Sequence, residues 1–491
     1  MTTVSAAFPA DDMLDRRRWA ALAVLLTGAF LAPLDFFIVN VAMPSITAGL
    51  GARPAQIQLV ISGYALVYAV FLITGGRLGD LFGRKAVFLA GLAGFAAASA
   101  LCGLAWSPDT LVLARLLQGL AAAAMAPQAL ASVHALFPVR ERGRALSLYA
   151  VTIGSSSAIG QLLGGALVGA DLGGYGWRLV FLINLPVTLL AFLAALPLLR
   201  ETRAATRPRL DWGGVAISSL GLAALILPLV EGREQGWPLW SILLLATAPV
   251  LLGLFRRYEI RLAEAGGEPL VAIDAFRTPG LLRGLSAILT LYAMATFFLT
   301  YAIYLQSGLR LSAWQSGLAI LPFTAGFLAA STFSPALGRL FGAAAPSMGF
   351  VVSATGAIAT ASAASAAPSW LLLGGAVTLI GLGMGLSMPT MMRVIVERVA
   401  PHRAGLVGGL VNTALQVSGA LSVAVLGGLF FTILGQHTDP AAIAQAFSMA
   451  MLAIAICHVG GAALSAGLGQ HRVPVLPPVT RAVRANCPAQ N

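Results

Sequence analysis

The sequence predicts an all-α polytopic membrane protein with fourteen transmembrane helices in a 6 + 2 + 6 arrangement. Three observations predict this fold class: the excess of apolar over charged residues, the distribution of arginines between loops, and an internal repeat. Of 491 residues, 58% are hydrophobic and 10% are charged, and the mean hydropathy is +0.87. Soluble proteins carry about 25% charged residues. The composition therefore excludes a soluble globule, a nucleic-acid binder and a disordered scaffold, despite the net charge of +12.

Fourteen apolar runs are long enough to cross a bilayer, which takes about 20 residues per helix. Glycine, proline, arginine and short polar clusters separate the runs. In chain order, the predicted spans are 19–43, 57–78, 86–106, 110–131, 145–169, 177–199, 211–231, 238–256, 281–305, 315–337, 347–367, 370–391, 405–433 and 446–467.

Arginines orient these spans, because basic residues collect in cytoplasmic loops. Of the 30 basic residues, 25 fall on the side that holds both termini. The opposite side has only Arg53, Arg178, Arg233 and Arg310, and Arg115 lies within a span. The asymmetry predicts that both termini are cytoplasmic, and it supports an even number of spans.

The chain also repeats itself. The hexapeptide LGDLFG at 78–83 recurs as LGRLFG at 337–342, which is 259 residues later. Pro127 corresponds to Pro389 at a similar offset of 262 residues. Two six-span halves with two inserted spans explain this offset. The predicted parts are a cytoplasmic N-terminal tail (1–18), an N-terminal six-helix bundle (19–200), two inserted linker helices (201–260), a cytoplasmic loop (261–280), a C-terminal six-helix bundle (281–467) and a cytoplasmic C-terminal tail (468–491).

Several function classes conflict with the sequence. Lys85 is the only lysine and does not follow a glycine, so a phosphate-binding loop of the form GxxxxGK[ST] is excluded. Three distant cysteines fit neither a disulfide framework nor a metal site. We find no GxSxG or HExxH motif for an enzyme and no soluble domain for a receptor. We therefore expect no metal or cofactor, and any active transport must draw on an ion gradient or on a separate ATPase subunit.

Asp35 is the acid that lies well inside a span, between Leu34 and Phe36. A carboxylate at that depth is costly unless it is solvated, paired or protonated, which makes it a candidate proton-coupling group. Arg115 is the one base within a span. At about 1.5 Å per helical residue, the two side chains lie at similar depths, so a pair or a shared water-filled cavity is possible. A structural carboxylate and a snorkelling arginine are the alternatives.

A glycine-rich loop with an acid and basic residues joins the second and third spans, in the sequence GGRLGDLFGRK at 75–85. Glycines let two helices turn within a short distance, and the charged groups can bond helix ends across the turn. This pattern predicts a conformational switch. Its residues are Gly76, Arg77, Gly79, Asp80, Gly83, Arg84 and Lys85.

Small residues in span five, Gly160 and Gly164 among them, allow close helix packing. Buried amides and aromatic residues elsewhere are candidates to line an amphipathic substrate cavity, although aromatic residues in apolar spans more often serve helix packing. The cavity candidates are Asn40, Tyr64, Tyr68, Gln118, Gln161, Phe298, Tyr301, Asn412 and Gln416.

These motifs together resemble a known family. The chain is similar, over nearly its whole length, to the fourteen-span drug:proton antiporter branch of the major facilitator superfamily, which implies a major facilitator fold. The segments that carry the resemblance are LDFFIVNVAMP (34–44), GGRLGDLFGRK (75–85), RLLQG (115–119), WRLVFLINLP (177–186), DWGG (211–214), YLQSGLRLSAWQSGLAILP (304–322) and RAGLVGGLVNTALQVSGA (403–420).

The resemblance implies a multidrug-efflux type of transporter in which Asp35 and Arg115 couple protons. It also implies that Asp80 and Arg84 control the inward–outward switch. The corresponding antiporter motif in span five comprises Gly160, Gln161, Gly164 and Gly165 here, and it departs from the family pattern, which has a proline where this chain has Gln161.

We therefore expect a proton-coupled exporter of small amphipathic compounds, such as drugs, antibiotics or toxic metabolites, that works by alternating access. A proton-coupled metabolite symporter of the same fold is the alternative, because Gln161 leaves the direction of transport open. We expect neutral or weakly cationic substrates, a bacterial plasma membrane location and a monomer. The near absence of lysine is typical of a GC-rich genome.

Overall fold

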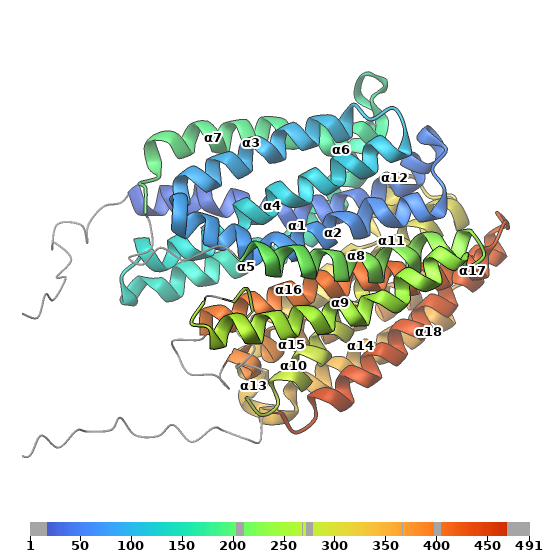
Figure 1. Cartoon of the computed structure of the whole chain (residues 1–491). Coiled ribbons are helices and arrows are strands. Elements are labelled where there is room, and N and C mark those ends of the chain that lie inside the picture. The colour runs from blue at the N-terminus through green and yellow to red at the C-terminus, as the bar shows by residue number, and fades with distance from the viewer. Residues whose placement is uncertain are drawn as a thin grey trace, which may run out of the picture.

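The computed structural model describes residues 17–202, 211–267, 269–271, 278–365, 367–396 and 404–468. Nearly all of these residues are helical, and the helices run nearly side by side across Figure 1. The predicted all-helical class is therefore confirmed. The predicted tails 1–18 and 468–491 fall almost entirely outside the described residues, as do residues 268 and 272–277 of the predicted loop 261–280.

The first group of helices spans the N-terminal part of the chain. Prolines in the first turn start α2 and α4, where their missing N–H leaves no donor unpaired. Ser107 caps α4 through the amide of Thr110, at 3.2 Å. The helices are α1 (Arg17–Leu50), α2 (Pro54–Phe82), α3 (Arg84–Gly103), α4 (Pro108–Leu136), α5 (Val139–Ala170), α6 (Leu179–Leu182) and α7 (Asn184–Leu198).

The second group covers the C-terminal part, and several of its predicted spans are broken. The span predicted at 281–305 consists of two α-helices and a π-helical turn, and a second π-helical turn interrupts the span predicted at 405–433. The elements are α10 (Leu281–Leu291), α11 (Met294–Ile303), η5 (Tyr304–Gly308), α12 (Ala313–Leu318), α13 (Leu321–Phe341), α14 (Ala345–Ala363), α15 (Trp370–Val396), α16 (Ala404–Ser422), η8 (Val423–Gly427), α17 (Gly428–Leu434) and α18 (Pro440–Ser465).

The internal repeat has a structural counterpart. Helix α4 packs along both α2 and α3, and α15 packs in the same way along α13 and α14. The repeated hexapeptides end α2 and α13, where Gly83 has a φ of 108° and Gly342 a φ of 51°. Residues that carry a side chain rarely adopt a positive φ, so glycine at these two positions allows the backbone to turn sharply after each helix.

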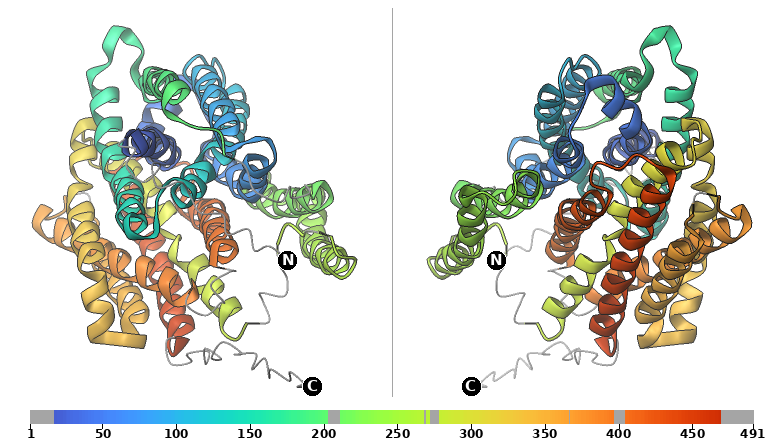
Figure 2. Two further views of the ribbon diagram at one scale, coloured as in Figure 1. Left: turned by 90° about the vertical axis from the view of Figure 1, so that its left-hand side faces the viewer. Right: turned by 90° about the vertical axis from the view of Figure 1, so that its right-hand side faces the viewer.

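The two inserted helices, α8 (Trp212–Glu234) and α9 (Leu239–Glu264), form a hairpin. Figure 2 shows this hairpin to one side of the other helices. Helix α8 contacts α2 from the first group as well as η8 and α17 from the second. The insertion is therefore in contact with both groups.

Large apolar side chains cover the outside of the structure. Leu190 on α7 is 68% exposed, Leu371 on α15 is 85% exposed, and Ile456 on α18 is 73% exposed. Soluble proteins rarely present such continuous apolar surfaces to water. Twelve stretches in the described part of the chain are long and apolar enough to cross a membrane.

That number differs from the predicted fourteen for two visible reasons. One stretch, Ala313–Ala363, contains both α13 and α14. In α5, the apolar segment Ile159–Ala170 is shorter than the other stretches and is not counted among the twelve. The number of fourteen membrane crossings stays a prediction.

Candidate functional site

Asp35 and Arg115 are in direct contact inside the first group of helices. Asp35 lies in the middle of α1 and Arg115 in α4, and neither side chain is exposed. Nη1 of Arg115 donates to Oδ2 of Asp35. Its Nε also donates to the carbonyl of Val60 on α2, at 3.0 Å, which fixes the guanidinium between three helices.

Two amide side chains complete the surroundings of Asp35. Nε2 of Gln118 and Nδ2 of Asn184 donate to Oδ1 of Asp35 at 2.9 and 2.8 Å. The hydroxyl of Ser99 on α3 accepts from the same two amides, at 2.8 and 3.3 Å, and so holds them in place. Donors from α4 and α7 therefore converge on one carboxylate of α1.

Aromatic rings enclose the arginine of this cluster. The ring of Tyr64 lies 4.1 Å from the guanidinium carbon of Arg115, and the ring of Phe181 lies 5.9 Å from it. Such cation–π contacts stabilise a cation that has lost water. The Tyr64 hydroxyl donates to the carbonyl of Ala32 at 2.8 Å, one turn before Asp35. The buried pair is thus in contact with aromatic and amide side chains of the first group.

Protonation of Asp35 would alter both the charge and the hydrogen bonds of this cluster. A buried ion pair is stable only while both charges and their hydrogen bonds are present. A proton on Asp35 removes the charge that Arg115 faces and converts an acceptor oxygen into a donor.

The predicted switch loop contains an ion pair and is hydrogen-bonded to the neighbouring helix α4. Nη2 of Arg84 donates to Oδ1 of Asp80 at 3.0 Å, and Nη1 of Arg84 donates to the carbonyl of Ala131 on α4 at 3.0 Å. Gly79 lies where a side chain would overlap Gln128 of α4. The loop is thus held against α4 by a hydrogen bond from a charged side chain and by close packing.

Glu201 contacts this loop from another part of the chain, and the sequence did not point to it. It follows α7, and its carboxylate accepts from the amides of Lys85 at 3.1 Å and Ala86 at 3.2 Å. An acid at the first turn of a helix interacts favourably with the helix dipole. Nothing in the sequence places Glu201 beside α3, because the two are more than one hundred residues apart.

Two other basic residues of the loop bond to backbone carbonyls. Nζ of Lys85 donates to the carbonyl of Leu196 on α7 at 2.6 Å. Arg77 donates to the carbonyl of Pro269, which follows the inserted hairpin. The loop therefore holds the ends of both α7 and the insertion. A methyl group on Gly76 would be in ordinary contact with Pro127 of α4, at 3.7 Å.

The antiporter-motif residues of α5 pack against two different helices. Gly160 and Gly164 lie against the backbone of α1, where an added methyl would lie 3.0 Å from the carbonyl of Leu34 and 2.7 Å from that of Ile38. Gly165 faces α12 of the second group, where a methyl would lie 2.6 Å from the carbonyl of Ala313. These glycines therefore let α5 contact both groups closely.

The predicted cavity residues do not lie together. Gln118 and Tyr64 belong to the Asp35 cluster, and Tyr68 lies beside Tyr64, with 6.1 Å between ring centroids. Nδ2 of Asn40 donates to the carbonyl of Phe36 within α1, at 2.7 Å.

The remaining candidates are distributed over both groups. Tyr301 stacks between Phe297 and Phe447. Gln161 is buried, and its backbone faces Gly317 of α12. Gln416 is half-buried on α16. The side chain of Asn412 lies outside the described residues.

Phe298 borders a small cavity between the two groups of helices. The cavity has a volume of about 80 Å³, and its walls are aromatic rings, methionines and small apolar residues. Phe37 of α1 and Phe298 of α11 meet there, with ring centroids 4.9 Å apart. The lining residues are Pro33, Phe36, Phe37, Ile153, Tyr292, Met294, Ala295, Phe298, Phe323, Phe327, Met384 and Met388.

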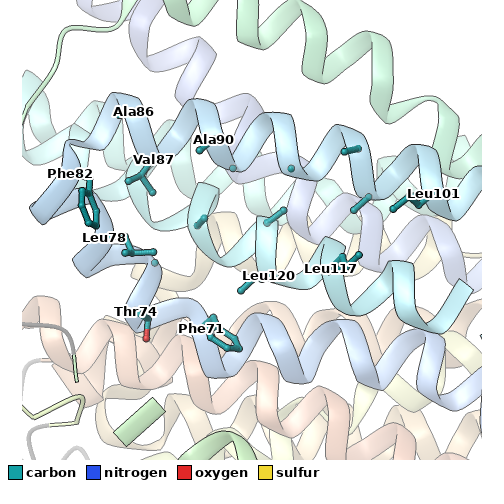
Figure 3. A pocket seen from close by; sticks show the side chains of 17 residues that line it. Phe71, Thr74, Leu78, Phe82, Ala86, Val87, Ala90, Leu101, Leu117 and Leu120 are labelled. Carbon is teal, nitrogen blue, oxygen red and sulfur yellow. The ribbon is translucent and has the colours of Figure 1, made fainter. Parts of the chain in front are cut away.

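A larger apolar groove, of about 720 Å³, lies elsewhere (Figure 3). Its walls come from α2, α3 and α4, and Thr74 is its one polar side chain. Leu101 and Leu117 border it and are about half exposed. All its residues belong to one group of helices, so we do not assign it to a transport pathway between the groups.

The sequence matches the Major Facilitator Superfamily over residues 25–423. Among its relatives, the probable actinorhodin transporter of Streptomyces coelicolor is 39% identical over 428 residues, 86% of this chain and 74% of that protein. The puromycin resistance protein pur8 of Streptomyces alboniger is 38% identical over 450 residues, covering 87% and 86% of the two chains. The tetracenomycin C resistance and export protein of Streptomyces glaucescens is 34% identical over 431 residues, covering 85% and 77%.

A solved structure shares the fold at low sequence identity. It is that of a bacterial homologue of the human lysosomal transporter Spinster, in an inward-facing and unoccupied conformation. The TM-score is 0.68 and the identity 18%, over 93% of this chain and 98% of that one. The chain belongs to the Major Facilitator Superfamily: it is a multi-pass membrane protein of a transporter family, and its relatives are drug and antibiotic export and resistance proteins.

Proposed function

We propose that this protein is a proton-coupled secondary active transporter that exports small amphipathic compounds by alternating access. The observation that carries the proposal is the contact between Asp35 and Arg115, in which a carboxylate and a guanidinium lie buried together in the helices. Ionisable residues within membrane helices are costly, and they mark ion pathways. Proton uptake by Asp35 would weaken the pair and favour one of two conformations.

The proposal includes a topology and an arrangement in the membrane. Fourteen spans, with both termini in the cytoplasm of a bacterial cell, agree with the arginine distribution. Two six-helix bundles, 19–200 and 281–467, would rock about the cavity between them. The inserted helices within 201–260 would connect the bundles. A monomer would suffice, because a single chain contains both bundles.

Planar, largely neutral aromatic compounds are the proposed substrates. Aromatic rings and methionine sulfurs line the cavity between the two groups, and none of its twelve lining residues is an acid. Rings and sulfurs bind flat aromatic surfaces well. The printed names of three relatives refer to actinorhodin, puromycin and tetracenomycin C. We therefore expect antibiotics of this kind to be transported better than permanent cations.

A proton-gradient assay in inside-out membrane vesicles tests the proposal. Puromycin, an anthraquinone dye and the permanent cation ethidium serve as probes. We expect puromycin or the dye to dissipate the interior acidic pH gradient with the wild-type protein, because export into the lumen releases protons. The Asp35→Asn variant should lose at least about 90% of this response, since an amide cannot carry a proton.

The control variant is Asp439→Asn, which changes an exposed helix-capping acid in the second group. Its response should match that of wild type, because asparagine also caps helices well. Equal activity of Asp35→Asn at matched expression would contradict proton coupling through Asp35. Uptake of a probe together with protons would support the symporter alternative. We retain that alternative because Gln161 replaces the proline of the antiporter motif.

A further inference from the structure

The DWGG sequence at 211–214 has no part in the proposed transport cycle. Asp211 lies just before α8, and the two glycines lie in the first turn of that helix. On the other helix of the hairpin, Tyr258 and Glu259 follow the predicted membrane span 238–256. All of these residues lie at the end of the hairpin that carries the arginines of α9: Asp211 begins the predicted span 211–231, and Tyr258 and Glu259 come after the span 238–256.

Asp211 and Glu259 hold the chain that follows the hairpin. Oδ1 of Asp211 accepts from the Tyr258 hydroxyl at 2.9 Å, and its Oδ2 accepts from the amide of Leu270 at 3.3 Å. Oε2 of Glu259 accepts from the amide of Val271 at 2.7 Å. Both acids are buried: Asp211 is 6% exposed and Glu259 is 0% exposed.

The two carboxyl groups meet over Gly214. A methyl group on Gly214 would lie 2.2 Å from Oδ2 of Asp211 and 2.4 Å from Oε1 of Glu259, so the two oxygens converge on one point. Gly213 leaves room in the same way for the hydroxyl of Tyr258. The glycines of the motif therefore make the space in which the acids approach each other.

Two buried carboxylates this close cannot both be charged at low cost. Burial, and then the hydrogen bond with Asp211, raise the pKa of Glu259 to about 8. Burial alone would raise the pKa of Asp211, but hydrogen bonds from Glu259, Gly214, Tyr258 and Leu270 lower it. A single proton on Glu259, donated to Asp211, is the arrangement that fits these surroundings.

Few other groups influence this proton. In the part of the chain that the structure describes, the charged or titratable groups that face the pair are Tyr258 of α9 and Arg77 of α2. Segment 269–271 contributes backbone amides and the carbonyl of Pro269, which accepts from Arg77. The acid pair thus fixes the segment to which the switch loop is bonded.

We propose that Asp211 and Glu259 share one proton and form a second proton-binding site, distinct from Asp35, that latches segment 269–271 and, through Pro269, Arg77 of the switch loop. This site assigns a role to the DWGG motif. It also links the chain between the two groups of helices to the loop between α2 and α3. The inference goes beyond the proposed function and depends neither on the substrate nor on the direction of transport.

The latch is expected to open at alkaline pH. Because the pKa of Glu259 is raised, its contribution is complete below the ordinary pKa of a glutamic acid and is lost as pH rises through about 8. Asp211 has the opposite sign: with a lowered pKa, its contribution is present above the ordinary value and lost only as pH falls through the lowered one. The latch therefore holds at neutral pH.

Infrared spectroscopy and amide hydrogen exchange test the latch on the full-length protein in lipid nanodiscs. We expect the wild type to show the carbonyl band of a protonated carboxylic acid that disappears as pH rises through about 8. Over the same range, the amides of Leu270 and Val271 should lose about tenfold in protection, after correction for the intrinsic pH dependence of exchange.

Glu259→Gln is the decisive variant, because its amide donates to Asp211 without ionising. It should lack the infrared band and keep segment 269–271 protected at pH 9. The matched control is Glu264→Gln, which changes an exposed acid of the same helix and should behave as wild type.

Asp211→Asn provides a second readout if Glu259→Gln does not fold, since it should also lose the pH response of segment 269–271. Three results would overturn the proposal: no titrating carboxylic band in the wild type, an unchanged band in Glu259→Gln, or loss of protection at pH 9 in that variant equal to wild type. None of these measurements requires transport, so a failure here is distinct from a failure of the export proposal.

Discussion

Asp35 accepts hydrogen bonds from three side chains on two other helices, and this number decides how it responds to substitution. Arg115, Gln118 and Asn184 all donate to its two oxygens. Removal of one partner of a buried ion pair typically costs 3–5 kcal/mol, because the remaining charge stays buried and unpaired. Stability and transport should therefore depend on this pair in different ways.

We predict that Arg115→Gln lowers the free energy of unfolding by about 3–5 kcal/mol. The double variant Asp35→Asn/Arg115→Gln should recover much of this loss, because two amides can bond to each other without a buried charge. It should nevertheless transport no protons. Thermal unfolding of the purified proteins, alongside the vesicle assay, measures both effects. A double variant no more stable than Arg115→Gln would contradict the interpretation of the contact as an ion pair.

The sequence singled out Asp35 and Arg115, with a pair or a shared cavity as the alternatives, but it did not place Asn184 and Ser99 beside them. Asp35 and Arg115 stand out because charges within apolar spans are rare and their depths follow from helical rise. Asn184 and Ser99 carry no such signal, since a buried amide or hydroxyl can bond within its own helix. Which helices lie beside α1 depends on tertiary packing, and one sequence does not specify it.

At the scale of helices, close packing between α2 and α4 depends on glycines that are not equivalent. A methyl group on Gly75 would lie 1.9 Å from the carbonyl of Ala123. The nearest atom to a methyl on Gly76 would be 3.7 Å away, on Pro127, which is ordinary contact. Adjacent glycines of one motif thus have different physical roles.

We predict that Gly75→Ala destabilises the protein by about 1–3 kcal/mol, because the backbone of α4 cannot move aside easily. Gly76→Ala is the matched control and should leave stability unchanged or increase it by up to about 1 kcal/mol, since alanine favours a helix over glycine. Thermal unfolding of the two variants decides the matter. Equal destabilisation by both would mean that the motif requires flexibility at this turn rather than close contact.

Element positions were largely predictable, but breaks within elements were not. Long apolar runs locate helices such as α4 well, because each span must satisfy its backbone internally. Helix α1 (Arg17–Leu50) exceeds its predicted span 19–43, since a helix need not end where the bilayer does. The π-helical turn η5, with the sequence YLQSG, lies at the end of the predicted span 281–305, and hydropathy alone does not distinguish a π-helical turn from an α-helical one.

At the scale of the whole molecule, the two groups of helices meet at the ends predicted to face outward. Nε2 of Gln306 in η5 donates to the carbonyl of Val41 in α1, at 2.8 Å. The backbone of Gln161 in α5 contacts Gly317 in α12. The repeat predicted two similar halves, but these contacts arise from residues that the repeat does not share, so their position was not predictable.

The glycine of α5 that faces the other group offers the sharpest test of this closure. A methyl on Gly165 would lie 2.6 Å from the carbonyl of Ala313, whereas one on Gly169, a turn later, would be in ordinary contact at 3.5 Å. We therefore predict that Gly165→Ala separates the outer ends of the two groups, and that Gly169→Ala does not. Spin labels at the exposed positions Leu172 and His437, in a cysteine-free background, report this distance by electron–electron resonance. Gly165→Ala should shift the distribution to longer distances, because the closed arrangement alone contains the clash. An unchanged distribution would mean that α5 and α12 can slide past the methyl group, and that this contact does not control closure.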